Sequence, residues 1–390
     1  MKKLYLLFFS YLVYLFSLFL YSFTQVDLDL TLSRSSIFQF LEKKFQYVGY
    51  FQRPESAMIF SILMVLAFVF YLIFFYLGWK KKLTKKQIWF LILGTFVFLI
   101  LSYNAFSYDI FNYMFDAKII THYGQNPYTT PALAFPHDPM INFMRWVHRV
   151  YPYGPFWLVL TVPLSYIGLN YFLPTFFLFK IMIGLSLLGT AYFISKILKE
   201  VSPENENLGL IFFALNPLVY IETFVSAHND MPMLFFCVLA LYLFIKRSYI
   251  NSAAAYLFSV GIKFATGLLA PVILYLGYLK YSKKKINWEH IFIFSSLFMV
   301  VAVFLATFRF VYQPWYFLYV LPFAALTPKK YYIYIPVFVI SILSLFQYLP
   351  FIAWGNWDPP VQTILVSTQL ASVAISALLV LIVFLFKKFA

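Results

Sequence analysis

The sequence is poor in cysteine and in charge. Its 390 residues include a single cysteine, Cys237, so one chain can form neither a disulfide framework nor a cysteine zinc cluster. Only 11% of the residues are charged, whereas 63% are hydrophobic. Because a soluble domain has about 25% charged residues, this composition excludes a soluble protein, a disordered chain and a coiled coil. The remaining fold class is an all-α polytopic transmembrane helix bundle.

Acidic residues are the scarcer charge, with 14 Asp and Glu against 29 Lys and Arg, for a formal net charge of +15. In so apolar a chain, this excess indicates cytoplasmic loops and anionic lipid headgroups rather than a nucleic-acid partner. The sequence also lacks a glycine-rich phosphate loop, a Walker motif and a Ser-His-Asp pattern, so it offers no recognisable nucleotide site.

Apolar segments set the expected number of membrane spans, since a transmembrane helix needs about 20 mostly apolar residues. Several segments are shorter than that, which is typical of helices that end inside the membrane around a cavity. The first segment is too long for a signal peptide and lacks a small-residue cleavage site, so we expect it to be retained. We predict twelve spans, near 4–23, 56–77, 88–106, 171–193, 208–225, 231–245, 251–262, 264–280, 288–307, 313–327, 331–350 and 361–386.

Lysine and arginine clusters predict the orientation of these spans. If residues 156–170 form a membrane-surface or half-inserted helix rather than a span, all the clusters between spans fall on one side. Both termini are then cytoplasmic in a plasma-membrane protein. The loops 24–55 and 107–170 are large and lie on the other face. We expect one domain over residues 1–390, with 107–170 as its catalytic outer loop.

The second outer loop begins with a polar pattern. Asp109, Asn112, Tyr113 and Asp116 are spaced i, i+3, i+4 and i+7, so a helix would place them on one face. Two carboxylates at the membrane border suit general-base chemistry or the coordination of a divalent cation such as Mg²⁺ or Mn²⁺. The alternative is that both are solvated loop residues at the end of a span.

These residues carry a resemblance to a known family. Asp-x3-Tyr-x2-Asp, followed by Gly124-x-Asn126-Pro127-Tyr128, resembles the first outer loop of the C-type (GT-C) membrane glycosyltransferases. It is most similar to the polyprenyl-phosphomannose-dependent mannosyltransferases of bacteria and archaea. Further matches follow in family order over about residues 100–320: Asn216-Pro217, Glu222, His228-Asn229-Asp230, Lys263 and Gln313-Pro314-Trp315-Tyr316. The sequence departs from the family at Asn112, where an arginine is common.

The resemblance implies roles for individual residues. Asp109 would be the catalytic base. Acceptor or sugar binding would fall to Asp116, Tyr113, His228, Asp230 and Glu222, and contacts to the donor phosphate to Lys263, Arg309 and Lys118. The residues alone leave other roles open. His228 and Asp230 could simply form a turn that caps the next helix, Arg309 could snorkel to the interface, and Lys180 could pair helices instead of contacting a donor. Trp157 and Trp315 read as interface anchors, although Trp315 could also stack on a sugar.

The function that follows is a membrane glycosyltransferase. It would move a hexose, mannose in the family, with inversion from a polyprenyl or dolichyl monophosphate to a hydroxyl of a glycolipid or glycan within the lipid bilayer. The sequence requires no cofactor, although Asp109 and Asp116 could bind a divalent cation. A transporter or flippase of a lipid-linked saccharide is the alternative from another class, but it is expected to show an internal repeat, and none is visible. A glycan polymerase or ligase that uses a lipid diphosphate is a further alternative.

Overall fold

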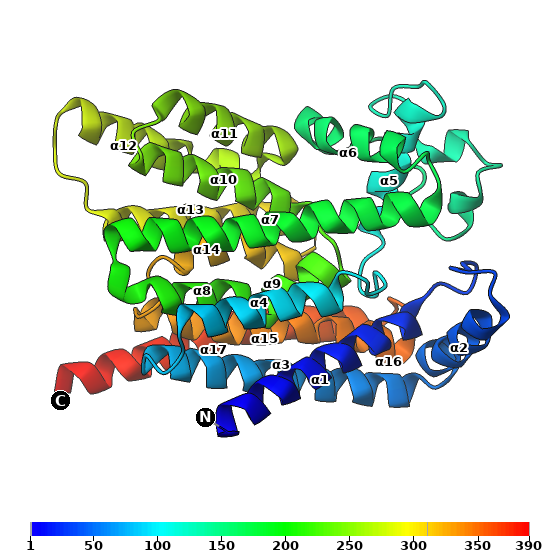
Figure 1. Ribbon diagram of the computed structural model, residues 1–390, viewed down its shortest axis with the longest axis horizontal. Helices are drawn as coiled ribbons and strands as arrows, with labels where there is room; N and C mark the ends of the chain where they lie inside the picture. Colours follow the sequence, from blue (N-terminus) through cyan, green and yellow to red (C-terminus); the bar gives the residue numbers. More distant parts are fainter. Residues whose placement is uncertain (1, 310, 390) are drawn as a thin grey trace.

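The computed structural model describes residues 2–309 and 311–389, and every regular element in this part of the chain is helical. Most of the long helices run side by side along the long axis of the molecule (Figure 1). This confirms the predicted polytopic helical bundle. The side chain of Arg309, one of the predicted donor contacts, lies outside the described residues.

Among the described residues, seven segments are long and apolar enough to cross a membrane. They contain α1 (Lys2–Ser22), α3 (Arg53–Trp79), α7 (Phe172–Val201), α12 (Ala270–Tyr281), α13 (Trp288–Arg309), α15 (Tyr331–Phe346) with α16 (Tyr348–Trp354), and α17 (Val361–Phe389). An eighth is a pair bent by 52° at Leu215–Asn216, which joins α8 (Glu206–Ala214) to α9 (Pro217–Tyr220).

The remaining predicted spans correspond to helices shorter than 18 residues. They are α4 (Lys85–Leu99), α10 (Asp230–Ile245), α11 (Tyr249–Ile262) and α14 (Leu321–Ala324). A helix rises about 1.5 Å per residue, whereas the hydrocarbon core is about 30 Å thick. None of the four is therefore long enough to cross alone, and the count of twelve spans stays a prediction.

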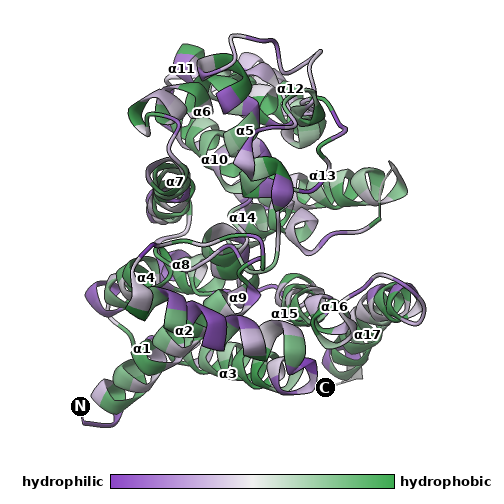
Figure 2. Cartoon of the chain, turned by 90° about the vertical axis from the view of Figure 1, so that its right-hand side faces the viewer, coloured by the Kyte–Doolittle hydropathy of each residue, from purple (hydrophilic) through white to green (hydrophobic). Residues whose placement is uncertain are grey.

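Three helices belong to the two predicted outer loops: α2 (Ser36–Gln46), α5 (Asp109–Thr121) and α6 (Pro155–Ile167). The helices α2 and α5 lie at the right of Figure 1, whereas the C-terminus lies at the left. Figure 2 looks onto the end with α2 and shows hydrophilic residues on this helix and on connecting segments, while most other helices are largely hydrophobic. The helix α6 has 13 residues, which agrees with a short helix rather than a span.

A glycine allows the second outer loop to approach the bundle. The backbone N–H of Gly154 donates to the carbonyl of Ile262 at 3.1 Å. A Cβ on Gly154 would lie 2.1 Å from the carbonyl oxygen of Gly261, a backbone atom that cannot move aside. Only glycine therefore permits this contact, which brings the start of α6 against the end of α11.

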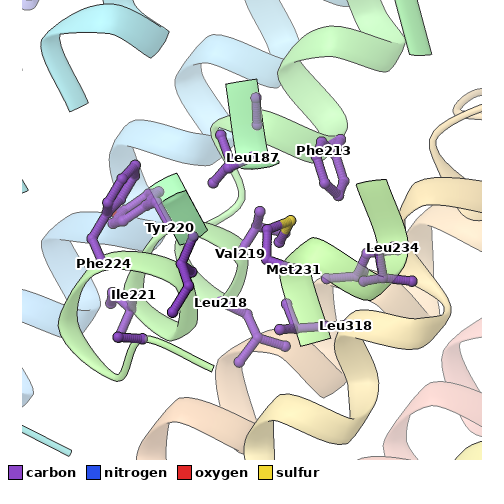
Figure 3. Packing of buried hydrophobic residues seen from close by; sticks show 14 of the residues in the cluster. Leu187, Phe213, Leu218, Val219, Tyr220, Ile221, Phe224, Met231, Leu234 and Leu318 are labelled. Carbon is purple, nitrogen blue, oxygen red and sulfur yellow. The ribbon is translucent and has the colours of Figure 1, made fainter. Parts of the chain in front are cut away.

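The core lies around the bent pair. Residues 208–234 form an unbroken buried run, and their apolar side chains pack against α7 and against the turn η8 (Pro314–Tyr319). Lipid tails are as apolar as these side chains, so the helices gain from close packing rather than from leaving water. Figure 3 shows this packing at Leu187, Phe213, Leu218, Val219, Tyr220, Ile221, Phe224, Met231, Leu234 and Leu318.

Lys180 has a structural partner inside this core. Its side chain is fully buried, and its ammonium donates to the carbonyl oxygen of Ser102 and to the Ser102 hydroxyl. Ser102 follows the end of α4, where carbonyl groups carry partial negative charge. Of the two roles open to Lys180, this contact favours helix pairing.

Candidate active site

Two segments far apart in the sequence are hydrogen-bonded at the base of the site. The backbone N–H of Ala105 donates to the carbonyl of Val225 at 2.9 Å, and the Asn104 side chain donates to the carbonyl of Ser226 at 3.0 Å. These bonds hold the residues just before α5 against the residues just before α10. Polar side chains at the start of both helices therefore meet.

Asp109 is the first residue of α5, where a carboxylate is favoured by the partial positive charge of the helix end. Its Oδ2 atom lies 3.3 Å from Nδ1 of His228 and accepts a hydrogen bond of 3.3 Å from the Tyr113 hydroxyl. The side chain is 14% exposed. Both contacts use Oδ2, and Oδ1 has no hydrogen bond to any described residue.

His228 lies between two carboxylates. Its Nε2 is 3.4 Å from Oε2 of Glu222, and its ring stacks on Trp315 with 3.9 Å between centroids and 22° between planes. The imidazole is fully buried, and neither nitrogen makes an aligned hydrogen bond to a described residue. Catalytic hydrogen bonds are often long or poorly aligned before substrate binds. The distances from His228 to Asp109 and Glu222 are therefore compatible with hydrogen bonds that tighten when substrate is bound.

Glu222 lies on the π-helical turn η6 (Ile221–Val225), a rare conformation that is frequent at functional sites. Its side chain is fully buried, and its two oxygens accept from the Tyr348 hydroxyl at 2.9 and 3.1 Å. Tyr348 belongs to α16, more than 100 residues later in the chain. Sequence reasoning missed Tyr348, because a tyrosine in an aromatic-rich span carries no distinguishing signal.

Lys263 and Asp230 form an ion pair of 2.7 Å. Asp230 begins α10 and is fully buried, whereas the Lys263 side chain is 19% exposed. Lys263 stands at the predicted break, between α11 and the turn η7 (Phe264–Leu269), and its ammonium lies 5.9 and 5.8 Å from the ring centroids of Tyr316 and Tyr319. Because Asp230 follows His228 by two residues, the lysine and Asp109 lie at the same end of the bundle.

Several polar atoms around this cluster have no hydrogen-bond partner among the described residues. They include both side-chain polar atoms of Asn229, Oγ of Ser226 and Oδ2 of Asp230, all in fully buried residues. An unpaired buried polar group costs about 1–3 kcal/mol, so such a concentration is typical of a binding site. Asn229 is a further candidate for contact with a substrate. Such contacts were expected from the sequence for its neighbours His228 and Asp230 but not for Asn229.

Lys118 is not brought to the cluster. Its ammonium pairs with the Asp138 carboxylate, which also accepts from the Tyr123 hydroxyl at 2.7 Å. Burial opposes ionisation of Asp138, but the hydrogen bonds from Lys118, the Met140 backbone and Tyr123, with the charge of Lys118, together outweigh it and lower the pKa of this carboxyl. The ion pair of Lys118 therefore stabilises the outer loop in this structure, and the expected contact of Lys118 with the donor phosphate gains no support.

Asn112 and Trp157 also have structural partners. The Asn112 amide donates to the backbone carbonyl of Arg145 at 2.8 Å. The guanidinium of Arg145 lies over the Tyr108 ring and 3.8 Å from the Asp27 carboxylate, which links the two outer loops beside Asp109. Trp157 is fully buried and lies edge-on to Tyr113, so the expectation that it anchors at the membrane interface was wrong.

Asp116 is buried in α5 and has no hydrogen bond to a described residue. No contact joins it to Asp109. No group of three or more His, Cys, Asp or Glu side chains arranged to hold a metal occurs in the part of the chain that the structure describes. The cation site suggested for Asp109 and Asp116 therefore gains no support.

Burial raises the pKa of Asp116 to about 8. The folded chain then holds a proton at a pH where the unfolded chain has released it, so this residue lowers stability as the pH rises from about 4 to about 8. We expect Asp116→Asn to raise the melting temperature at pH 8 by a few degrees, on the order of 2–4 °C. At pH 5 the difference should be smaller.

Differential scanning fluorimetry at both pH values measures this difference. Asp138→Asn is the matched control, since its carboxyl has a lowered pKa and an ion pair, and its loss should destabilise the protein at pH 8. An Asp116→Asn protein that is less stable than wild type at pH 8 would contradict the prediction.

A comparison with protein families gives one match. The model of the MptA_B family, described as the N-terminal domain of alpha-(1->6)-mannopyranosyltransferase, matches residues 32–278. No curated protein matches the chain, and no solved structure does so. The matched region contains Asp109, Glu222, His228, Asp230 and Lys263, whereas Trp315 and Tyr348 lie beyond it.

Proposed function

Because the chain belongs to the MptA_B family of alpha-(1->6)-mannopyranosyltransferases, we propose that it transfers mannose from a polyprenyl monophosphate to a hydroxyl group. The acceptor is a glycolipid or glycan at the membrane surface. The absence of a nucleotide motif in the sequence supports a lipid-linked donor, and the apolar helices give the lipid tail a bilayer in which to dissolve.

Asp109 is the general base in this proposal. With Oδ2 facing Tyr113 and His228, Oδ1 is the oxygen left to accept the acceptor's hydroxyl proton. The acceptor oxygen forms a bond to the anomeric carbon as the bond from that carbon to the phosphate oxygen breaks. Attack from the face opposite the phosphate inverts the anomeric configuration. The proton ends on Asp109, and the electron pair leaves with the lipid phosphate.

His228 and Glu222 orient this base. The imidazole faces one acid at each nitrogen, Asp109 at 3.3 Å from Nδ1 and Glu222 at 3.4 Å from Nε2. The Trp315 face and the two carboxylates then fix the plane of the imidazole. The ring is fully buried between these acids and Trp315, so it presents no exposed edge to a sugar hydroxyl. We therefore propose positioning for His228 and Glu222 in place of the sugar contacts that the resemblance implied.

Lys263 stabilises the departing phosphate. A fixed cation where negative charge develops lowers the barrier more than it tightens binding of the substrate. Asp230 holds the ammonium at 2.7 Å, and partial exposure leaves its other protons free for the phosphate. The observation that carries the proposal is this placement of a carboxylate with a free oxygen and a lysine at one end of the bundle.

The test supplies purified protein with radiolabelled polyprenyl phosphomannose and a panel of glycolipid acceptors. A glycosidic product that requires the lipid monophosphate donor supports the proposal. Transfer from a nucleotide sugar or from a lipid diphosphate would overturn it. Movement of the lipid across a vesicle bilayer without product would favour the flippase.

Tyr348→Phe tests the far end of this arrangement. The phenylalanine keeps the stack against Phe106 but removes the hydrogen bonds to Glu222. A hydrogen bond to a charged group contributes about 1.5–3 kcal/mol, and if about half of that reaches the transition state, kcat falls about tenfold. We expect KM for the donor to change little, because Tyr348 acts through Glu222 and His228.

Tyr312→Phe is the control for this variant. Its hydroxyl forms a hydrogen bond of 2.7 Å with Ser344, so the substitution removes a comparable bond without touching Glu222. Equal losses of kcat in the two variants would show that Tyr348 serves the fold alone.

A further inference from the structure

A second candidate site lies at the end of the bundle opposite to α2 and α5. A cavity of about 550 Å³ opens between the end of α7, the start of α13 and the turn that joins α14 to α15. These elements lie toward the left of Figure 1, with the C-terminus, and away from Asp109. The catalytic proposal makes no use of this cavity.

Three lysines line the cavity: Lys285, Lys329 and Lys330. Lys330 is paired with Glu289 at 2.6 Å, whereas no carboxylate among the described residues lies within 4 Å of the other two ammonium groups. Glu289 is the single acid in the lining. The lining therefore has an excess of two positive charges, and both belong to lysines without an ion pair.

Two helix starts add to this positive potential. Lining residues include Trp288 and Glu289, which begin α13, and Lys330, which immediately precedes α15. The first backbone N–H groups of a helix have no partner within the helix, and they favour anions. Asn205 and Thr327 bring further polar groups to the walls, while Phe292 and Leu326 are apolar.

We propose that this cavity binds the phosphate group of an anionic amphiphile. Basic pockets between membrane helices are recognised sites for lipid headgroups. Unpaired lysines and helix starts provide for the phosphate, and the apolar wall provides for the adjoining carbon chain. An anionic phospholipid and a soluble phosphate compound share this chemistry, and the test distinguishes them. The site is independent of the catalytic proposal, because it involves none of the same residues.

The test is native mass spectrometry of the full-length protein with phosphatidylglycerol, with phosphatidylcholine or with inorganic phosphate. We expect wild type to retain one phosphatidylglycerol at the lowest lipid concentrations and to show no such preference for phosphatidylcholine. The double variant Lys285→Ala/Lys329→Ala should bind phosphatidylglycerol at least tenfold more weakly. If the apolar wall contributes to affinity, millimolar inorganic phosphate should not displace bound phosphatidylglycerol. Displacement by inorganic phosphate would show that the phosphate group alone gives the affinity, and would favour a soluble phosphate compound as the ligand.

The control is Lys86→Ala/Lys284→Ala, which removes two lysines that do not line the cavity. It should bind as wild type does. Equal weakening in both double variants would show general attraction to basic loops and overturn the proposal, as would unchanged binding in Lys285→Ala/Lys329→Ala. Lys285 and Lys329 are exposed at the surface, so both variants are expected to fold.

Discussion

Asp109→Asn should slow mannosyl transfer by about a hundredfold or more while the protein folds normally. Asparagine keeps the shape of the side chain and can still accept from Tyr113, but its oxygen cannot take a proton from the acceptor. General-base catalysis contributes a factor of about 10²–10⁴ to the rate, so we expect kcat to fall by a factor in this range relative to wild type. The measurement is the initial rate of product formation from the labelled lipid donor at saturating acceptor.

The control for this variant is Asp29→Asn, which changes an exposed acid in the first outer loop. It should keep wild-type activity. Binding of the donor, measured separately, should be unchanged in Asp109→Asn, because the base does not contact the phosphate in the proposed arrangement. An Asp109→Asn enzyme with a tenth or more of wild-type kcat would remove Asp109 from the role of base.

The second large effect is expected for Lys263→Met. Loss of one group that stabilises developing charge lowers kcat by about 10²–10³-fold, and methionine keeps the length and apolar stem of the side chain. The substitution also leaves Asp230 buried without its cation, which disturbs the fold by itself. Steady-state kinetics should therefore be measured on the fraction of protein that elutes as a folded species.

The double variant Lys263→Met/Asp230→Asn separates these two causes. Removing both charges relieves the unpaired carboxylate, so the melting temperature should recover relative to Lys263→Met. Activity should not recover, because the phosphate still lacks its cation. Restored activity in the double variant would show that Lys263 serves only to neutralise Asp230.

The sequence predicted the architecture well where the signal was length and apolarity. The long runs that became α1, α3, α7, α13 and α17 stand out against any polar background. The short helices were harder to place, because a run of 14–16 apolar residues fits a half-span, a surface helix or part of a bent pair equally well. Residues 156–170 were predicted as a short helix only because a span there would have reversed every later lysine cluster.

The members of the candidate site were recognised only in part, for a physical reason. Asp109, His228 and Lys263 stood out because ionisable residues are costly near the membrane and therefore conspicuous in the sequence. Tyr348, the partner of Glu222, was hidden because 23% of the residues in the chain are aromatic. Trp315 was visible in its motif, but its stacking on His228 was not predicted. Lys118 shows the opposite error, because its charge was visible in the sequence while its pairing with Asp138, 20 residues later, was not.

The contacts of Trp315 and Tyr348 limit how segments of this protein can be exchanged with those of its relatives. The family model matches residues 32–278, but two aromatic side chains from beyond this range contact the site. Trp315 stacks on the His228 ring, and the Tyr348 hydroxyl donates to Glu222. Exchanging residues 279–390 with those of a distant relative would thus replace both aromatic side chains that support the proposed base through His228 and Glu222. The segment that the family model matches is therefore shorter than the segment that supplies the proposed site.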